Sequence, residues 1–193
     1  MKLSLVIPVF NEGSLIRTHL NVIVDTVRSA IDCELEIFLV DDGSSDNTYS
    51  EVGSICTRYE FVRYVPLSRH FGKEAAIFAG LESSSGDAIV VMDSDLQHPP
   101  KLVSEMLEAC KDSFMVVHGC KASRGKESVT YGLFSKVFYA ILGKLTGLDI
   151  AGHSDHNLLG RDVVNRYCGL SERSRFFKRM IPYLGFRSHN ILF

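Results

Sequence analysis

Five short apolar segments, each followed by turn-forming residues, constrain the fold of this chain more than any other feature of its sequence. The segments expected to form strands are residues 3–10, 35–40, 61–65, 88–92 and 114–119. Because they are apolar along most of their length, both faces of each strand should be buried. Segments with helical periodicity separate them. This alternation predicts an α/β fold, in which helices cover both faces of a parallel sheet.

The segments between these strands carry the apolar stripes of amphipathic helices. The first helix is expected to bury Leu20, Ile23, Val24, Val27 and Ile31 along one face. The next helix is expected to be capped by Ser45 or Asp46. Two further helices are expected over residues 72–84 and 100–110. A helix in each interval agrees with a parallel sheet.

Composition excludes several classes of protein. The 193 residues suffice for one domain with a sizeable core, and 46% of them are hydrophobic. The net charge of −2 gives no reason to expect a nucleic-acid partner. The five cysteines lack any C-x-x-C pair, which indicates reduced thiols and neither a disulfide framework nor a zinc site. No window reaches the about 18 continuous apolar residues of a membrane-spanning helix.

Three polar clusters follow predicted strands, at the ends where parallel sheets bind ligands. They are "PVFNE" at 8–12, "VDDGS" at 40–44 and "MDSDLQ" at 92–97. Asp93 and Asp95 would share a face of an extended segment, where their charges repel unless a cation, proton or donor intervenes. Each cluster alone could be a turn that bonds its own backbone. Together, their carboxylate and amide oxygens indicate a site for phosphate with Mg²⁺ or Mn²⁺.

Other nucleotide-binding and catalytic motifs are absent from the sequence. No G-x-G-x-x-G follows the first strand and no G-x-x-x-x-G-K-[ST] occurs, which argues against a dinucleotide oxidoreductase or a P-loop enzyme. No G-x-S-x-G elbow occurs either, which weakens a hydrolase interpretation. The remaining class binds a nucleotide through acidic loops and a metal ion.

Several ordered motifs resemble those of family 2 glycosyltransferases, namely "SLVIPVFNE", "FLVDDGSSDNT", "LSRHFGKEAAIFAGLESSSGDAIVVMDSDLQHPP" and "RGKES…SKVFY". They are most similar to the polyprenyl-phosphate sugar transferases, such as the dolichyl-phosphate mannosyl-, undecaprenyl-phosphate glucosyl- and aminoarabinosyl-type enzymes. The resemblance implies a GT-A fold, with a Rossmann-like, mostly parallel sheet, helices on both faces and a smaller acceptor-side region. It also implies one domain with a nucleotide-sugar-binding half over residues 1–120 and an acceptor-side half over residues 121–193.

The resemblance assigns donor-side roles to individual residues. It implies a nucleotide-sugar pocket formed by Pro8, Phe10, Glu12, Asp41, Asp42, Asp93, Ser94 and Asp95. Phe10 would lie against the base, and the ligands of Mg²⁺ or Mn²⁺ would be Asp93, Asp95 and Gln97. The implied reaction is an inverting, metal-dependent transfer of a hexose-type sugar from a UDP- or GDP-sugar by a single in-line displacement. The metal would offset the charge that develops on the departing diphosphate.

On the acceptor side, the resemblance implies a polyprenyl phosphate. The second pKa of a phosphate monoester is near ~6, so this acceptor is already an oxyanion at neutral pH. Lys121 and Arg124, with Lys126 close by, would hold the phosphate; the alternative is a solvated basic loop. Lysine at 121 stands where the family usually has arginine, which replaces a bidentate fork with a point charge.

Asp95 and Asp155 are the candidate catalytic residues. The sequence reads "DHNLLGRD" from Asp155, where the family usually shows D-F-R-L. His156 and Asn157 therefore replace an aromatic residue and a cation. His153 and His156 are not expected to bind a metal ion together, because no third ligand lies nearby in the sequence. The departure keeps two alternatives open: a glycosyltransferase that acts on a saccharide acceptor, and a catalytically weak GT-A subunit that binds nucleotide-sugar or a partner.

Residues 171–193 mix basic and aromatic side chains. Such a segment is either a packed helix with a solvated face or a peripheral contact with an anionic membrane surface. Family members usually continue into interfacial and transmembrane helices, so the sequence could be a fragment that stops before them. The resemblance places the protein at the cytoplasmic face of the membrane, and a homo-oligomer is left open.

Overall fold

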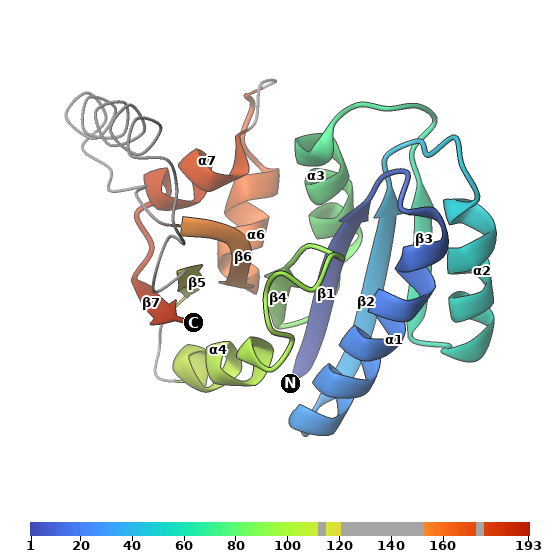
Figure 1. Cartoon of the computed structure of the whole chain (residues 1–193). Helices are drawn as coiled ribbons and strands as arrows, with labels where there is room; N and C mark the ends of the chain where they lie inside the picture. Colours follow the sequence, from blue (N-terminus) through green and yellow to red (C-terminus); the bar gives the residue numbers. More distant parts are fainter. Residues whose placement is uncertain (112–114, 121–152, 173–175) are drawn as a thin grey trace, which may run out of the picture.

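The computed structural model describes residues 1–111, 115–120, 153–172 and 176–193. These residues form a seven-stranded sheet with the order β3-β2-β1-β4-β6-β5-β7 (Figure 1). Its strands are β1 (Lys2–Val9), β2 (Glu34–Asp41), β3 (Val62–Pro66), β4 (Ala88–Val91), β5 (Val116–Cys120), β6 (His153–Gly160) and β7 (Ser188–Leu192). Neighbouring strands run parallel except for β6, which is antiparallel to both β4 and β5. The predicted mostly parallel sheet is confirmed.

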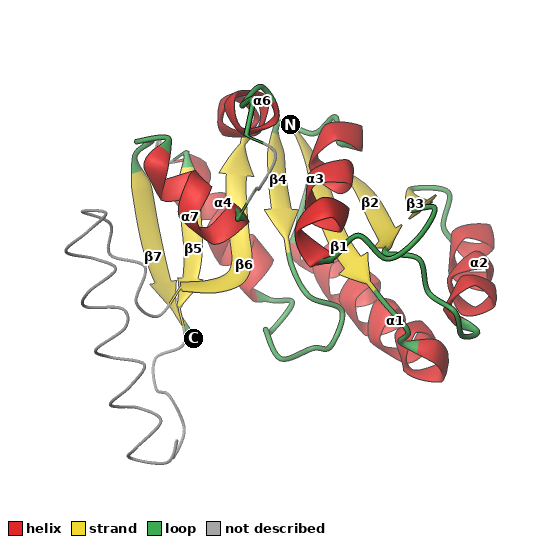
Figure 2. Cartoon of the chain, turned by 90° about the horizontal axis from the view of Figure 1, so that it is seen from above, coloured by secondary structure: helices red, strands yellow, loops and turns green. Residues whose placement is uncertain are grey.

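Helices cover both faces of this sheet (Figure 2). They are α1 (Gly13–Ala30), α2 (Thr48–Arg58), α3 (Lys73–Ser83), α4 (Leu102–Lys111), α6 (Arg161–Cys168) and α7 (Phe177–Tyr183). One hydrophobic core lies between the sheet and α1, α2 and α4, and a second lies between the sheet and α3, α6 and α7. The sheet is therefore buried on both sides, as its continuously apolar strands require.

The predicted helix boundaries agree with the structure to within two residues, but the N-cap of α2 differs from the predicted one. The expected face of α1 is buried, and Ile31 lies just beyond the helix, partly buried against the same core. The N-cap of α2 is Asn47, so the prediction of Ser45 or Asp46 is wrong. Asp46 nevertheless supplies the capping bond, because its carboxylate accepts hydrogen bonds from the backbone N–H of Thr48 at 3.0 Å and from the Thr48 hydroxyl at 2.5 Å, whereas the Asn47 side chain makes no such bond. The helix itself starts one residue later than a cap at Asp46 predicts.

Helix α3 approaches the sheet closely because Gly80 has no side chain. A Cβ atom at this position would lie 2.3 Å from Val6 Cγ1 and 3.0 Å from Val40 Cγ2. The first contact is shorter than real Cβ atoms make and the second is tight, so a side chain here would push α3 away from β1 and β2. The spacing between α3 and the sheet is thus set by one glycine.

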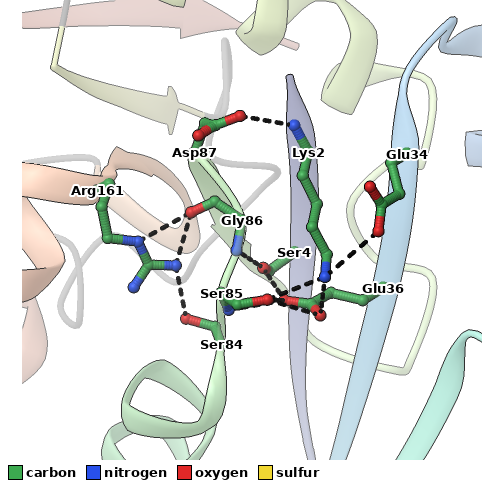
Figure 3. A network of polar contacts seen from close by, with 9 residues as sticks. All are labelled: Lys2, Ser4, Glu34, Glu36, Ser84, Ser85, Gly86, Asp87 and Arg161. Atoms are coloured by element: carbon green, nitrogen blue, oxygen red, sulfur yellow. Dashed lines mark hydrogen bonds and ion pairs between the residues drawn. The ribbon is translucent and has the colours of Figure 1, made fainter.

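A buried carboxylate joins the amino ends of β1, β2 and β4 (Figure 3). Glu36 is 3% exposed, and it pairs with Lys2 Nζ at 2.7 Å. The Ser4 hydroxyl donates to Glu36 at 2.6 Å, and the Ser85 backbone N–H donates to it at 2.7 Å. Burial by itself would raise the pKa of Glu36, but the hydrogen bonds from Lys2, Ser4 and Ser85 outweigh it and lower the pKa to about 2.

The same network includes Arg161, the first residue of α6, and so extends to β6 and α6 (Figure 3). Its guanidinium donates to the carbonyl of Gly86 from Nε at 2.9 Å and from Nη2 at 2.6 Å. The Gly86 N–H in turn donates to the Ser4 hydroxyl at 2.8 Å. Because β6 runs antiparallel to β4, its end and Arg161 lie at the amino edge of the parallel strands. Arg161 therefore ties β6 and α6 to the strands that carry the acidic loops.

Candidate active site

A cavity of about 310 Å³ lies where β1, β2 and β4 end. Parallel α/β sheets bind ligands at this edge, since the loops that follow the strands converge there. Four carboxylates and one ammonium group lie among the described side chains of its wall. The cavity is lined by Pro8, Val9, Phe10, Glu12, Asp42, His70, Lys73, Asp93, Ser94 and Asp95.

The structure brings the predicted nucleotide-sugar residues to this cavity with one exception, Asp41. Its carboxylate is 3% exposed and is absent from the cavity lining. It accepts hydrogen bonds from the backbone N–H of Ser44 at 2.8 Å, the Ser44 hydroxyl at 2.6 Å and the Tyr64 hydroxyl at 2.5 Å. Burial and the bond to Asp41 raise the pKa of Tyr64. The geometry assigns Asp41 to holding the loop after β2.

Asp42 faces the cavity and fixes the loop that precedes α3. It is 2% exposed and accepts hydrogen bonds from the backbone N–H of Phe71 at 2.8 Å and of Gly72 at 2.9 Å. His70 Nδ1 lies 2.9 Å from Oδ2 of the same carboxylate. Gly43, with a φ of +73°, lets this loop pass, because a Cβ there would lie 2.4 Å from the carbonyl carbon of Arg69. Two segments distant in sequence thus meet at one carboxylate.

Phe10 and His70 form an aromatic wall of the cavity. Their ring centroids are 4.3 Å apart, and the ring planes are inclined by 30°. Phe10 is 42% exposed, which is unusual for a phenylalanine at the end of a buried strand. An exposed aromatic face at a polar cavity is a surface on which a planar ring can stack.

Glu12 links the first loop to the acidic loop after β4. It accepts a hydrogen bond from the Ser94 hydroxyl, while its own backbone N–H donates to Thr48 Oγ1 at 2.9 Å. Burial raises the pKa of Glu12, and the charges of Asp95 and Asp93 add to this effect, while the bond from Ser94 opposes it. Glu12 is thus a carboxyl group in an already acidic cavity, held through both its side chain and its backbone.

The acidic loop presents Asp93 and Asp95 at the end of β4. Asp93 Oδ1 lies 2.6 Å from Lys73 Nζ, and Asp95 Oδ1 accepts from the Gln97 backbone N–H at 3.0 Å. Leu96, between Asp95 and Gln97, has a φ of +57°, a left-handed conformation that a leucine rarely adopts. Gln97 is exposed and is not part of the cavity lining.

The oxygen donors of this loop fit a divalent cation only in part. Asp93 and Asp95 offer hard carboxylate oxygens, and the repulsion between them and Glu12 favours a bound cation. Among the described residues, however, no three His, Cys, Asp or Glu side chains are arranged to hold a metal ion. Mg²⁺ is commonly bound by one or two carboxylates together with substrate phosphates. The site therefore fits a metal that arrives with, or is completed by, a diphosphate.

The acceptor-side predictions fall largely outside the described residues. Lys121, Arg124 and Lys126 lie outside them altogether. Asp155 lies in β6, of which the backbone is described at this position. The pairing of β4 with β6 ends at Val91 and Asn157, and β6 begins beyond it at the cavity edge of the sheet. This backbone placement is compatible with the expected role of Asp155.

The two residues that depart from the family pattern, His156 and Asn157, are buried. They are 0% and 3% exposed, and Asn157 Oδ1 lies 2.6 Å from Nδ1 of His118. The ring of His156 packs near that of His98, with 5.5 Å between centroids. Burial, with a smaller effect of His98, lowers the pKa of His156 to about 3, so the ring is neutral. The departure changes the interior beneath the site and adds no described residue to the cavity wall.

Sequence reasoning assigned no role to His70, Lys73, Tyr64 or Thr48. All four are polar residues that the fold brings to the acidic loops from elsewhere in the chain. His70 and Lys73 lie in the quoted motif "LSRHFGKEAAI", whose glycine between a polar run and a helix was the available signal.

The described part of residues 171–193 packs as α7 and the edge strand β7. Phe177 and Ile181 of α7 are buried in the second core, whereas Phe176 and Tyr183 are 48% and 74% exposed. The buried residues agree with a packed helix, and the exposed aromatic residues are those that a contact with a membrane surface would use. No helix in the described part of the chain has the length and apolarity that crossing a membrane requires.

Comparison with known proteins gives consistent results. An uncharacterized glycosyltransferase of Synechocystis sp. is 34% identical over 194 residues, covering 100% of this chain and 61% of that protein. A prophage bactoprenol glucosyl transferase homolog of Escherichia coli is 32% identical over 189 residues, covering 96% of this chain and 60% of that protein. The chain thus spans about 60% of the length of these relatives.

Solved structures share the fold at lower sequence identity. A mannosyltransferase of Pyrobaculum calidifontis in complex with GDP-Man and Mn²⁺ aligns with a TM-score of 0.69 at 19% identity, over 98% of this chain and 54% of that chain. Glucosyl-3-phosphoglycerate synthase of Mycobacterium tuberculosis, in complex with Mn²⁺, UDP and phosphoglyceric acid, aligns with a TM-score of 0.68 at 20% identity, over 99% and 68%. Residues 4–168 match the family described as glycosyl transferase family 2. The chain therefore belongs to glycosyl transferase family 2 and has the GT-A fold of that family.

Proposed function

We propose that this chain transfers a sugar from a UDP- or GDP-sugar to a polyprenyl phosphate, with inversion and with a divalent metal ion. The observation that carries the proposal is the cavity in which Asp93 and Asp95 lie close to an exposed Phe10. An acidic loop beside an aromatic surface suits a metal-bound diphosphate joined to a base. Relatives named bactoprenol glucosyl transferases support the lipid acceptor.

The donor would lie across the carboxyl ends of β1, β2 and β4. The base would stack on the aromatic wall at Phe10. The buried Asp42 carboxylate would accept a hydrogen bond from the base or from a ribose hydroxyl. Asp93 and Asp95 would hold the metal ion, which as a Lewis acid offsets negative charge on the leaving diphosphate. Glu12, held by Ser94 and Thr48, would fix the distance between the base end and the acidic loop.

The acceptor side needs cations more than it needs a strong base. A phosphate monoester with a second pKa near ~6 is already ionised at neutral pH and can attack the anomeric carbon directly. Lys121 and Arg124 are proposed to hold this phosphate, and Asp155 is proposed to orient it. Because β6 reaches the same edge of the sheet as the acidic loop, the attack would come from the β6 side of the cavity.

A lipid-borne acceptor requires the site to face a membrane surface, which we propose to be the cytoplasmic one. The exposed aromatic residues Phe176 and Tyr183 accompany the exposed cations Arg179 and Arg187 in the described part of residues 171–193. Aromatic and basic side chains together favour contact with an anionic interface. A saccharide acceptor and a weak binding subunit remain the competing functions. The burial of His156 and Asn157 removes one motive for the latter.

The test is a transfer assay with purified protein. Labelled UDP-glucose and GDP-mannose are each offered with polyprenyl phosphate in detergent and, separately, with free saccharides, in the presence of Mg²⁺ or Mn²⁺. We expect transfer to the lipid phosphate from one donor, and its loss with a chelator or in Asp95→Asn. Transfer to saccharides alone would establish the first alternative. Metal-dependent nucleotide binding without any single-turnover transfer would establish the second.

A further inference from the structure

The acidic loop, which is proposed to bind the metal ion, already contacts a cation that belongs to the protein. Lys73 Nζ lies 2.6 Å from Asp93 Oδ1, a contact distance typical of a short charge-assisted hydrogen bond. Lys73 is 41% exposed at its side chain and Asp93 is 24% exposed, so the pair lies at the wall of the cavity. A residue expected to bind metal is thus engaged by an ammonium group.

The position of Lys73 in its helix is unfavourable for a cation. Lys73 is the first residue of α3, where the helix dipole favours negative charge. Gly72, which precedes it with a φ of +100°, and the backbone bonds to Asp42 fix where the helix begins. The placement is therefore explained by the carboxylates of the cavity and not by the stability of α3.

Lys73 and a metal ion would compete for the same carboxylate. Mg²⁺ binds carboxylate oxygen at about 2.0–2.1 Å, closer than the ammonium group on Asp93 Oδ1 does, and two cations on one carboxylate repel each other. A metal ion on Asp93 is therefore expected to displace Lys73. The ammonium group then stays on a flexible stem at the cavity wall, where the described acidic neighbours include Glu12 and Asp42.

A diphosphate offers the displaced ammonium group a new partner. The negative charges of the donor would lie in this cavity if the proposed function holds, and a lysine at a helix N-terminus can bind phosphate oxygens. We propose that Lys73 is an exchange cation: it holds Asp93 in the metal-free site, is displaced by the metal, and transfers to the nucleotide diphosphate. This exchange makes metal and nucleotide binding cooperative. The second half of the exchange rests on the proposed function, and the competition at Asp93 does not.

The experiment measures metal affinity apart from catalysis. Free Mn²⁺ is titrated by electron paramagnetic resonance against the full chain, alone and with saturating UDP or GDP, for the wild type, Lys73→Met and Lys73→Arg. Lys101→Met is the matched control, since Lys101 is an exposed lysine near the acidic loop that does not line the cavity. Thermal unfolding confirms that each variant is folded.

We expect Lys73→Met to bind Mn²⁺ alone more tightly, by roughly tenfold, and to lose most of the nucleotide-dependent gain that the wild type shows, within the 5- to 150-fold range typical of coupled sites. Lys73→Arg and Lys101→Met should resemble the wild type. Weaker or unchanged Mn²⁺ binding by Lys73→Met without nucleotide would overturn the exchange. A wild type that binds Mn²⁺ but neither UDP nor GDP would refute the proposed function instead, while tighter Mn²⁺ binding by Lys73→Met would still support competition at Asp93.

Discussion

Replacing Glu36 with glutamine tests how far the charge network at the amino edge stabilises the fold. The ordinary pKa of 4.5 falls to about 2 in the folded chain. At 1.36 kcal/mol for each pH unit, this difference corresponds to about 3 kcal/mol of stability. Because the folded pKa is depressed, that stability is present above pH 4.5 and is lost as the pH falls from about 4.5 towards 2. Glu36→Gln keeps the shape of the side chain, removes the charge and replaces one acceptor oxygen with an NH₂ donor.

The assay is urea unfolding of wild type and variant at several pH values between 7 and 3. At pH 7 we expect Glu36→Gln to lower the free energy of unfolding by about 3 kcal/mol. The gap should narrow as the pH falls below 4.5, because the unfolded wild type then takes up a proton at Glu36, whereas the folded chain, with a pKa of about 2, does not. Glu34→Gln is the control: Glu34 contacts the same Lys2 at 3.4 Å but is 70% exposed, so its loss should cost less than about 0.5 kcal/mol. A gap that is equal at pH 7 and pH 3 would refute the reasoning, since packing and not charge would then explain the loss.

Three other outcomes are expected. Gly80→Ala, whose Cβ would lie 2.3 Å from a valine methyl, should lower the free energy of unfolding in urea by about 1–3 kcal/mol. The control Gly53→Ala, with no atom within 4 Å of the added Cβ, should raise the free energy of unfolding by up to about 1 kcal/mol. Equal effects of the two substitutions would contradict the packing argument. Thr48→Val removes the acceptor for the N–H groups of Glu12 and Gly13, so calorimetry should show UDP or GDP affinity reduced by about tenfold; unchanged affinity would show that the loop is held otherwise. Saturating nucleotide at ~100 times its Kd should add about 2.7 kcal/mol of stability with Mn²⁺ in a thermal-shift assay, and equal stabilisation in a chelator would remove the metal requirement.

The sheet could be predicted where its strands are continuously apolar, and less well where they are not. Strands β1 to β5 were expected within two residues of their observed limits, because burial on both faces leaves a clear pattern. Strand β6, "HSDHNLLG", begins with polar residues and buries two of them, His156 and Asn157, so it lacks the continuous apolar pattern by which a buried strand is predicted. The antiparallel direction of β6 depends on long-range pairing with β4, which the local sequence does not encode.

The candidate site could be predicted where it depends on residues that end strands. Asp93, Asp95 and Asp42 follow buried strands, so the geometry of a parallel sheet brings them together. Lys73 and His70 reach the cavity from the segment between β3 and α3, through contacts that form only in the folded chain. Sequence spacing says nothing of such contacts. The separation of Asp41 from the cavity likewise follows from its bonds to Ser44 and Tyr64.

The amino-edge network has a consequence for engineering this protein. At that edge the carboxylate of Glu36 is satisfied by the protein's own Lys2, Ser4 and Ser85, whereas at the cavity edge the carboxylates of the acidic loop are suited to a cation from solution. The two edges should thus respond to different solution variables, the first to proton concentration and the second to divalent cations. Variants that strengthen the amino edge could make the protein more resistant to acid without altering its response to metal ions.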